Sequence, residues 1–441
     1  MTIKKATLIV FALWCLLQLV IMVVYFNHEL VPDSAKYISD ALQSLTTGTP
    51  YPSQKNLYDT YIFAPGFVAY LTIIIRLFGT YKAAMIINLL MNIGIVWGVY
   101  YITKRFFDKS TALISVILYC LLFSNLFVPL HIITEVPYLF LCLLGFIFTL
   151  QDKPAYLIAG GVAYALAYTM RPLVLAFLIA SLVYLFIHKR KLVYYFCLLF
   201  VYGLLLFAYS QYNKSNCGYG IVSSTTGGYN LIMTANDGAT SIANFSIYQQ
   251  PGQPGYIPNA ACVPFAVKDS IWKARSIVWI KQHPVRYASL VAKRVPRLYS
   301  ADCWPLSSVF AINTMSNALQ SANPTKALRE RRIVQGIESI TYYLVMLFFL
   351  LALYKERRNI FSDKGTLLLI VLLGTGGTCL FPVELRYHYP YLYAITIWAA
   401  AWVSAKMRER SSSQRRGGRK GSAGMQGLAI FAAWREKISR E

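Results

Sequence analysis

The sequence predicts an all-α protein that crosses a membrane about ten times, and three observations support this fold class. First, 57% of the 441 residues are hydrophobic and 14% are charged, whereas soluble domains carry roughly 25% charged residues. Second, apolar runs close to the length of a membrane-spanning helix recur along the chain. Third, Lys and Arg lie in short clusters between these runs, so the formal net charge of +24 indicates membrane topology rather than nucleic-acid binding.

The first apolar run, Ala6–Phe26, lacks a small-residue cleavage site, so we expect a retained first span rather than a removed signal peptide. The apolar runs are Ala6–Phe26, Ile62–Phe78, Ala83–Ile102, Ala112–Val128, Ile132–Leu150, Ala155–Met170, Leu173–Ile187, Leu192–Gln211, Ile340–Tyr354, Thr366–Phe381 and Tyr389–Ala405.

The basic residues decide how many of these runs cross. If every run crosses, Lys104 and the cluster His188–Lys191 lie outside, against the positive-inside rule. If Ile62–Phe78 does not cross, the basic clusters all lie inside, and Arg76 within this run also argues against a crossing. We therefore predict ten spans, with Ile62–Phe78 as a re-entrant or interfacial helix on the outer face. A chain of eleven spans that breaks the rule is the alternative.

This topology divides the chain into four parts. Residues 1–211 form an N-terminal transmembrane module with a first outer loop at 27–81, and residues 212–339 form a large extracytoplasmic loop. Residues 340–405 form the C-terminal transmembrane helices, and residues 406–441 form a basic cytoplasmic tail. The tail is rich in Arg, Ser and Gly, which predicts disorder, with a weak amphipathic segment at Gly427–Ile438.

Asp33 is the candidate catalytic acid of the first outer loop. It follows the first span directly and precedes Ser34–Leu45, which has helical spacing. A carboxylate there can cap the helix, or it can serve as a general base at the membrane surface. Asp40 and Asp59 are weaker candidates, because they lie farther from the membrane end of the loop.

Two further polar positions interrupt apolar sequence on the predicted outer face. Glu135 begins a span, where a carboxylate is either favoured by the helix dipole or functional. His131 nearby is better explained as an interfacial polar residue than as a ligand. The pair Arg171-Pro172 breaks a long apolar stretch, and the proline explains the break but not the arginine. Arg171 suits a phosphate, or a pairing with Glu135 or Asp33.

The segment Glu384–Pro390 places many polar and aromatic groups between the last two spans. Glu384 and Arg386 either neutralise each other at the interface or belong, with Tyr387, to a phosphate or sugar site. In the large loop, Val267–Leu298 is basic and amphipathic with a break at Pro284, which predicts helices lying on the membrane, facing anionic lipid or simply anchored there.

The cysteines give no metal motif. Five of the eight lie in apolar runs, and Cys217, Cys262 and Cys303 lie in the large loop, where two could pair if the loop is external. Neither CxxC nor HExxH occurs, so no cofactor is predicted and a divalent metal has no support from the sequence.

These landmarks occur together in one known family. They are Asp33-x-x-x-Tyr37, Gly48, Ala64-Pro65-Gly66, Thr134-Glu135, Arg171-Pro172, Gly228-Tyr229-Asn230-Leu231, His283-Pro284 and Glu384-x-Arg386-Tyr387. In order and spacing, over about Ala6 to Ala405, they resemble the GT-C glycosyltransferases that use polyprenyl-phosphate sugars. Within this class the chain looks like the bacterial relatives of protein O-mannosyltransferases and the lipid A aminoarabinose transferase. The chain departs from many relatives in having Asp33-Ser34 where an Asp-Glu pair often stands.

The resemblance implies an inverting transfer from a polyprenyl-phosphate sugar to an acceptor hydroxyl on a lipid, glycan or protein. It implies Asp33 as the base and Glu135 as the second acid. It also implies substrate-binding roles for Tyr37, Arg171, Arg294, Glu384, Arg386 and Tyr387, with the arginines neutralising the leaving phosphate. A bacterial inner membrane, with the site facing outward, is the expected location.

Two other classes of protein fit part of the sequence. A transporter or lipid flippase predicts internal repeats and broken helices near the midplane, but no repeat is visible and the polar residues gather at one face. A glycan polymerase or ligase would share the donor carrier and the outer face. No Walker motif or dinucleotide fingerprint supports ATP-driven or nicotinamide chemistry.

Overall fold

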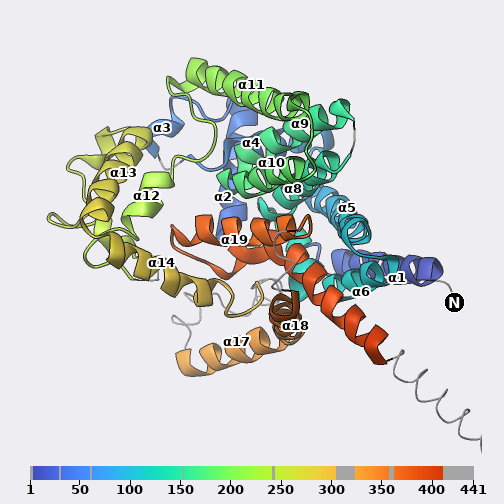
Figure 1. The fold of residues 1–441 in the computed structure, drawn as a ribbon. Helices are drawn as coiled ribbons and strands as arrows, with labels where there is room; N and C mark the ends of the chain where they lie inside the picture. The colour runs from blue at the N-terminus through green and yellow to red at the C-terminus, as the bar shows by residue number, and fades with distance from the viewer. Residues whose placement is uncertain are drawn as a thin grey trace, which may run out of the picture.

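The fold is a bundle of α-helices, as the sequence predicts (Figure 1). This is a computed structural model, and it describes residues 3–28, 31–59, 62–151, 153–240, 244–303, 323–356 and 362–410. Within these ranges the regular structure is helical and no strand occurs. The predicted amphipathic segment at Gly427–Ile438 lies outside the described residues.

Each of the ten predicted spans contains a helix. The bundle helices are α1 (Ile3–Val24), α5 (Ala83–Phe106), α6 (Lys109–Cys120), α8 (Glu135–Thr149), α9 (Pro154–Met170), α10 (Leu175–Ile187), α11 (Leu192–Cys217), α18 (Ile340–Glu356), α19 (Gly365–Cys379) and a helix at 392–410. Among the described residues, α1, α5 and α11 are by themselves long and apolar enough to cross a membrane. Two bent pairs raise this number to as many as five: α6 with Phe123–Leu130, and α17 (Pro324–Glu338) with α18. The count of ten crossings stays a prediction.

Glycines allow α8, α9 and α11 to pack closely. Gly145 on α8 faces the ring of Tyr164 on α9. A Cβ at Gly161 would lie 2.7 Å from the backbone oxygen of Leu198 on α11. In a membrane, where lipid is as apolar as the helix surfaces, small residues of this kind are what permit helices to pack.

One end of the bundle collects the segments predicted to be cytoplasmic. The turn before α6 contributes Asp108, whose carboxylate lies 2.8 Å from Arg408 at the end of helix 392–410. Lys355 at the end of α18 lies 2.6 Å from Glu409 on the same helix. Three connections that are far apart in the sequence therefore meet at one face, and all three are rich in Lys and Arg.

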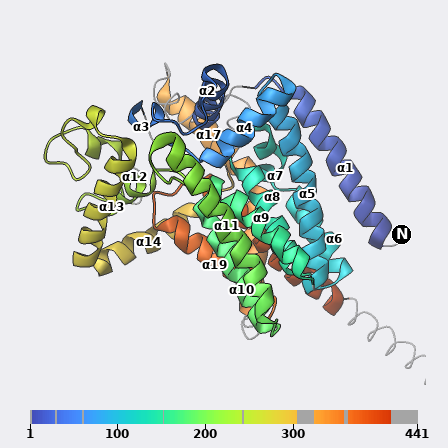
Figure 2. The same ribbon diagram turned by 90° about the horizontal axis from the view of Figure 1, so that it is seen from above.

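The other end collects the predicted outer segments. His28, just past α1, lies 3.3 Å from His131, just before α8. Here the chain forms α2 (Pro32–Thr47), α3 (Asn56–Asp59) and η1 (Val128–Leu130), after the short α7 (Phe123–Phe127). Figure 2 shows α2 and α17 at one end of the long helices, with the chain's N-terminus and the far end of helix 392–410 toward the other.

Helix α4 (Pro65–Phe78) begins and ends at this outer end. Before it, the backbone N–H of Ile62 donates to Thr225 of the large loop. After it, Lys82 donates to Asn27, directly beyond α1. Its 14 residues span about 21 Å, less than a hydrocarbon core of about 30 Å. These contacts support the prediction that this run does not cross.

Residues 227–298 of the large loop form a helical layer beside the bundle in both views (Figures 1 and 2). The helices of this layer are α12 (Gly227–Ile232), η3 (Phe245–Tyr248), η4 (Ala260–Cys262), α13 (Phe265–Gln282) and α14 (Pro284–Leu298), and the loop also includes α17, which leads into α18. The break between α13 and α14 falls at Pro284, as predicted. All eight cysteines are free, so the pairing considered for Cys217, Cys262 and Cys303 does not form.

Candidate active site

Four segments that are far apart in the sequence bring charged side chains together at the end of the bundle that holds the predicted outer segments. They are the first turn of α2, the start of α8, the turn between α9 and η2 (Pro172–Val174), and η5 (Leu385–Tyr391). They contribute Asp33, Glu135, Arg171 and Arg386, in that order. The result is one connected network of ion pairs.

Asp33 is a partly exposed acid with a direct partner in this network. Its carboxylate lies 2.5 Å from Nη2 of Arg386, and its side chain is 31% exposed, against 1% for Glu135. The N-cap of α2 is Val31, and no side chain caps the helix, so the interpretation of Asp33 as an N-cap is wrong. Pro32 starts the helix, which places Asp33 in its first turn.

Glu135 is buried and held by two arginines. Its Oε1 lies 2.6 Å from Nη2 of Arg171 and 3.7 Å from Nε of Arg386. Arg171 also donates through Nε to the Thr134 hydroxyl at 2.6 Å. Thr134 belongs to the Thr134-Glu135 motif, but the sequence alone does not indicate that its hydroxyl accepts a hydrogen bond from Arg171.

Arg386 is the centre of the network. Besides Asp33 and Glu135, it contacts Glu384, whose Oε2 lies 2.9 Å from Nε. Burial lowers the pKa of Arg386, but the charges of Asp33 and Glu384 outweigh this effect and hold the pKa above its ordinary value. The guanidinium therefore stays charged.

Two aromatic side chains complete the cluster. The ring of Tyr387 has the guanidinium groups of Arg171 and Arg386 each 5.5 Å from its centre. Tyr37, one turn after Asp33 on α2, is buried with its ring 4.8 Å from that of Phe67. Burial and then the charge of Asp33 raise the pKa of Tyr37, so its hydroxyl stays protonated.

Arg294 lies outside this cluster. It is fully buried on α14, where it donates to the backbone oxygens of Cys379 at 3.0 Å and Thr234 at 3.3 Å. These bonds tie α14 to the end of α19 and to the loop after α12. The Arg294 guanidinium is therefore bound to backbone oxygens of distant segments, and the local sequence around Arg294 does not predict these contacts.

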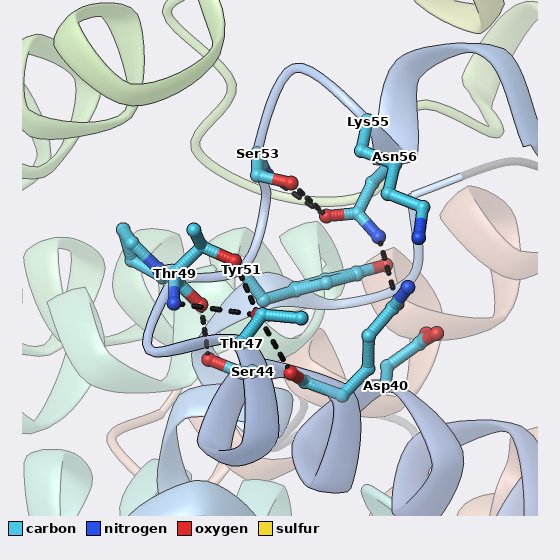
Figure 3. A pocket seen from close by; sticks show the side chains of 10 residues that line it. Asp40, Ser44, Thr47, Thr49, Tyr51, Ser53, Lys55 and Asn56 are labelled. Carbon is cyan, nitrogen blue, oxygen red and sulfur yellow. Dashed lines mark hydrogen bonds between the residues drawn. The ribbon is translucent and has the colours of Figure 1, made fainter.

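Asp40 belongs to a separate place, two turns along α2 from Asp33. Its carboxylate lies 2.5 Å from Lys36. It lines a small polar hollow between α2 and the following loop, where the Tyr51 ring lies among Asp40, Thr47 and Asn56 (Figure 3). The hollow has a volume of about 20 Å³, room for about one water molecule. The side chain of Asp59 lies outside the described residues.

Among the residues that the structure describes, one group has the composition of a metal site. Asp302, Cys303 and His388 place their ligand atoms within 4.8 Å of one another, and all three side chains are buried. Since they come from two distant segments, no local motif could have found them.

Comparison with known proteins finds one matching family and several solved structures with a similar fold. Residues 64–211 match the family described as dolichyl-phosphate-mannose-protein mannosyltransferase. No curated protein sequence matches the chain at a significant level. The apo oligosaccharyltransferase of Archaeoglobus fulgidus aligns over 91% of this chain and 51% of its own, with 11% identity and a TM-score of 0.51. ArnT from Cupriavidus metallidurans, bound to undecaprenyl phosphate, aligns over 90% of this chain and 77% of its own, with 10% identity and a TM-score of 0.39.

The chain spans about half the length of the archaeal oligosaccharyltransferase. At 11% identity this likeness concerns the fold, and the family match covers less than half of the chain. Together they confirm the resemblance found from the order of the motifs. The chain has the fold of the GT-C membrane glycosyltransferases, and its residues 64–211 are similar to the protein mannosyltransferase family.

Proposed function

We propose that this protein transfers a sugar from a polyprenyl-phosphate donor to an acceptor hydroxyl, with inversion at the anomeric carbon. The observation that carries the proposal is the network of Asp33, Glu135, Arg171 and Arg386 at one end of the bundle. It combines an accessible carboxylate with two guanidinium groups. Those are the groups that such a transfer needs at the attacking hydroxyl and at the leaving phosphate.

In the transfer, Asp33 is the base. The acceptor oxygen attacks the anomeric carbon and forms the new glycosidic bond, while its proton passes to the Asp33 carboxylate. The bond between the anomeric carbon and the phosphate oxygen breaks, and the polyprenyl phosphate leaves with the electron pair. Arg386 and Arg171 stabilise the charge on this leaving group. Buried Glu135 positions both arginines.

The charge balance suggests how donor binding activates the base. Within the network, the carboxylates of Asp33, Glu135 and Glu384 outnumber the guanidinium groups of Arg171 and Arg386. A donor phosphate must therefore compete with a carboxylate for an arginine. The pairs of Arg386 with Asp33 and with Glu384 are exposed enough to open, whereas Glu135 is buried. The phosphate takes Arg386, and Asp33 is released for the acceptor hydroxyl.

The charges at the two ends of the bundle support an outward-facing site. The basic connections around Asp108, Lys355 and Arg408 lie together at one end, which the positive-inside rule assigns to the cytoplasm. The network lies at the other end, so the reaction occurs on the extracytoplasmic face. A bacterial inner membrane is the proposed location.

Sugar transfer by the purified protein in detergent tests the proposal. Undecaprenyl- and dolichyl-phosphate sugars serve as donors, with a lipid extract, a glycan and a peptide as acceptors. Asp33→Asn should lower the transfer rate at least about a hundredfold, the usual contribution of a general base. Asp40→Asn on the same helix is the matched control, and its rate should stay near that of the wild type.

Two outcomes would redirect the assignment. Donor binding without turnover, under every condition and in the wild type, would instead support a flippase or transporter. Equal loss of transfer in Asp33→Asn and Asp40→Asn would point to damage to α2 rather than to loss of a base.

A further inference from the structure

Three buried side chains with metal-binding chemistry meet where η5 contacts the segment that follows α14. Asp302 and Cys303 follow α14, and His388 lies two residues after Arg386. Their exposed fractions are 0%, 2% and 0%. Nε2 of His388 lies 4.0 Å from Oδ1 of Asp302, and the three ligand atoms all lie within 4.8 Å of one another.

The hydrogen bonds around His388 aim its free nitrogen at the other two groups. Nδ1 lies 2.8 Å from the backbone oxygen of Leu298, so this nitrogen carries the proton and donates it. Nε2 is then an unprotonated acceptor, and it is buried without a hydrogen-bond partner among the described residues. A backbone contact of this kind is how metal-binding histidines are commonly oriented.

Two backbone N–H groups orient the carboxylate of Asp302. Its Oδ2 accepts from the backbone N–H of Ser124 at 3.2 Å, and its Oδ1 accepts from the backbone N–H of Cys303 at 2.8 Å. The distance of 4.0 Å from Oδ1 to His388 is too long for a hydrogen bond between them. Burial without a counter-charge disfavours the ionised carboxylate, so a nearby cation would stabilise ionised Asp302.

A divalent cation would supply that charge. A thiolate and a carboxylate contribute two negative charges, and the imidazole is neutral, so a dication leaves the buried group neutral overall. Sulfur disfavours Mg²⁺ and Ca²⁺, which take oxygen ligands, and the mixture of S, N and O suits Zn²⁺.

We propose that Asp302, Cys303 and His388 bind a zinc ion, with a water molecule as the fourth ligand. Tetrahedral zinc with ligands at about 2.0–2.3 Å places neighbouring ligand atoms about 3.5 Å apart. The ligand atoms must therefore close in by about 0.5–1.3 Å from their present separations. Side-chain rotation and small shifts of the loop supply such movements.

The metal acts by positioning. It joins the segment after α14 to η5, and Asp302 links both to α7 through Ser124. Because η5 also carries Arg386 and Tyr387, zinc fixes the segment that presents these two side chains to the ion-pair network. The site stands on its own geometry and does not depend on which reaction the network performs.

Zinc content of the full-length protein tests the site. The detergent-purified chain is incubated with ZnCl₂, desalted and analysed by elemental mass spectrometry. The wild type should retain one equivalent per chain. Cys303→Ser and His388→Gln should each weaken zinc affinity at least about tenfold, since even outer-shell changes at metal sites have effects of that size. Cys120→Ser, a buried cysteine on α6, should retain zinc as the wild type does.

Cobalt provides a second readout, which in the wild type does not depend on any substitution. CoCl₂ added to the metal-free wild type should give a sulfur-to-cobalt charge-transfer band, which Cys120→Ser preserves and Cys303→Ser loses. Gel filtration shows whether each variant remains monodisperse. A wild type that retains no zinc and gives no sulfur-to-cobalt band would overturn the proposal, as would a Cys303→Ser variant that binds like the wild type.

Discussion

Asp33 faces two opposing demands. An ion pair with Arg386 holds it in place before substrate arrives, but the same pair occupies a carboxylate oxygen that the acceptor hydroxyl has to reach. Its partial exposure resolves the conflict, since water and a donor phosphate can both reach the pair. Glu135 has no such freedom, because it is buried between two arginines.

Arg386 should control donor affinity. Arg386→Ala removes a charge-assisted contact worth about 1.5–3 kcal/mol, so donor binding should weaken roughly ten- to a hundredfold. Arg386→Lys keeps the charge but loses the planar fork, and it should recover only part of the affinity. Equilibrium binding of a non-hydrolysable polyprenyl-phosphate analogue measures this. Unchanged affinity in Arg386→Ala would assign the phosphate contact to Arg171.

The buried pair of Glu135 and Arg171 should show strong coupling in stability. Arg171→Met leaves Glu135 without its closest cation and should destabilise the protein by about 3–5 kcal/mol. Glu135→Gln combined with Arg171→Met should recover much of this loss, because no uncompensated charge remains. The wild type, Glu135→Gln, Arg171→Met and the double variant form a double-mutant cycle, and thermal unfolding in detergent measures the stability of each. A double variant no more stable than Arg171→Met would contradict the coupling.

At the scale of elements, the sequence located the helices well and their contacts poorly. Apolar runs and Pro172 predicted the end of α9 and the break before α10, and Pro284 predicted the break between α13 and α14. These are local signals, because proline removes an N–H donor and restricts its neighbours. Arg294 shows the limit: the family resemblance implied a phosphate contact, whereas tertiary contacts bury it against backbone carbonyls.

The packing of α9 on α11 should depend on Gly161. A methyl group there would meet the backbone oxygen of Leu198 at 2.7 Å, and overpacking of this kind costs about 1–3 kcal/mol. Gly161→Ala should therefore lower the melting temperature. Gly203→Ala on α11, where a Cβ meets nothing within 4 Å, is the control and should not lower it. Equal effects of both substitutions would rule out close packing as the cause.

At the scale of the whole molecule, the fold explains why most of the candidate site could be found in the sequence. Helices that alternate in direction return their ends to the same two faces, so polar residues at alternate span boundaries lie on one face, where they can meet. Asp33, Glu135, Arg171 and Arg386 were identified in this way. Asp302, Cys303 and His388 were not identified together, because their meeting depends on how the large loop folds back on the bundle.

The direction of the bundle in the membrane can be tested with single cysteines introduced on a Cys262→Ser background, which removes an exposed thiol. A membrane-impermeant maleimide applied to intact cells should label Val285→Cys, which is 82% exposed in the large loop. It should label Lys191→Cys only after the cells are opened, because the basic connection before α11 is predicted to be cytoplasmic. The reverse pattern would place the ion-pair network in the cytoplasm and remove the proposed outward-facing reaction.

The same assay decides whether α4 crosses. Gln54 precedes this helix, Thr80 follows it, and both residues are exposed. Since α4 begins and ends at the outer end of the bundle, Gln54→Cys and Thr80→Cys should both be labelled from outside in intact cells. If α4 crossed, the two positions would lie on opposite faces and one alone would react. Because every later connection would then change sides, the labelling of Val285→Cys and Lys191→Cys provides an independent check on the same conclusion.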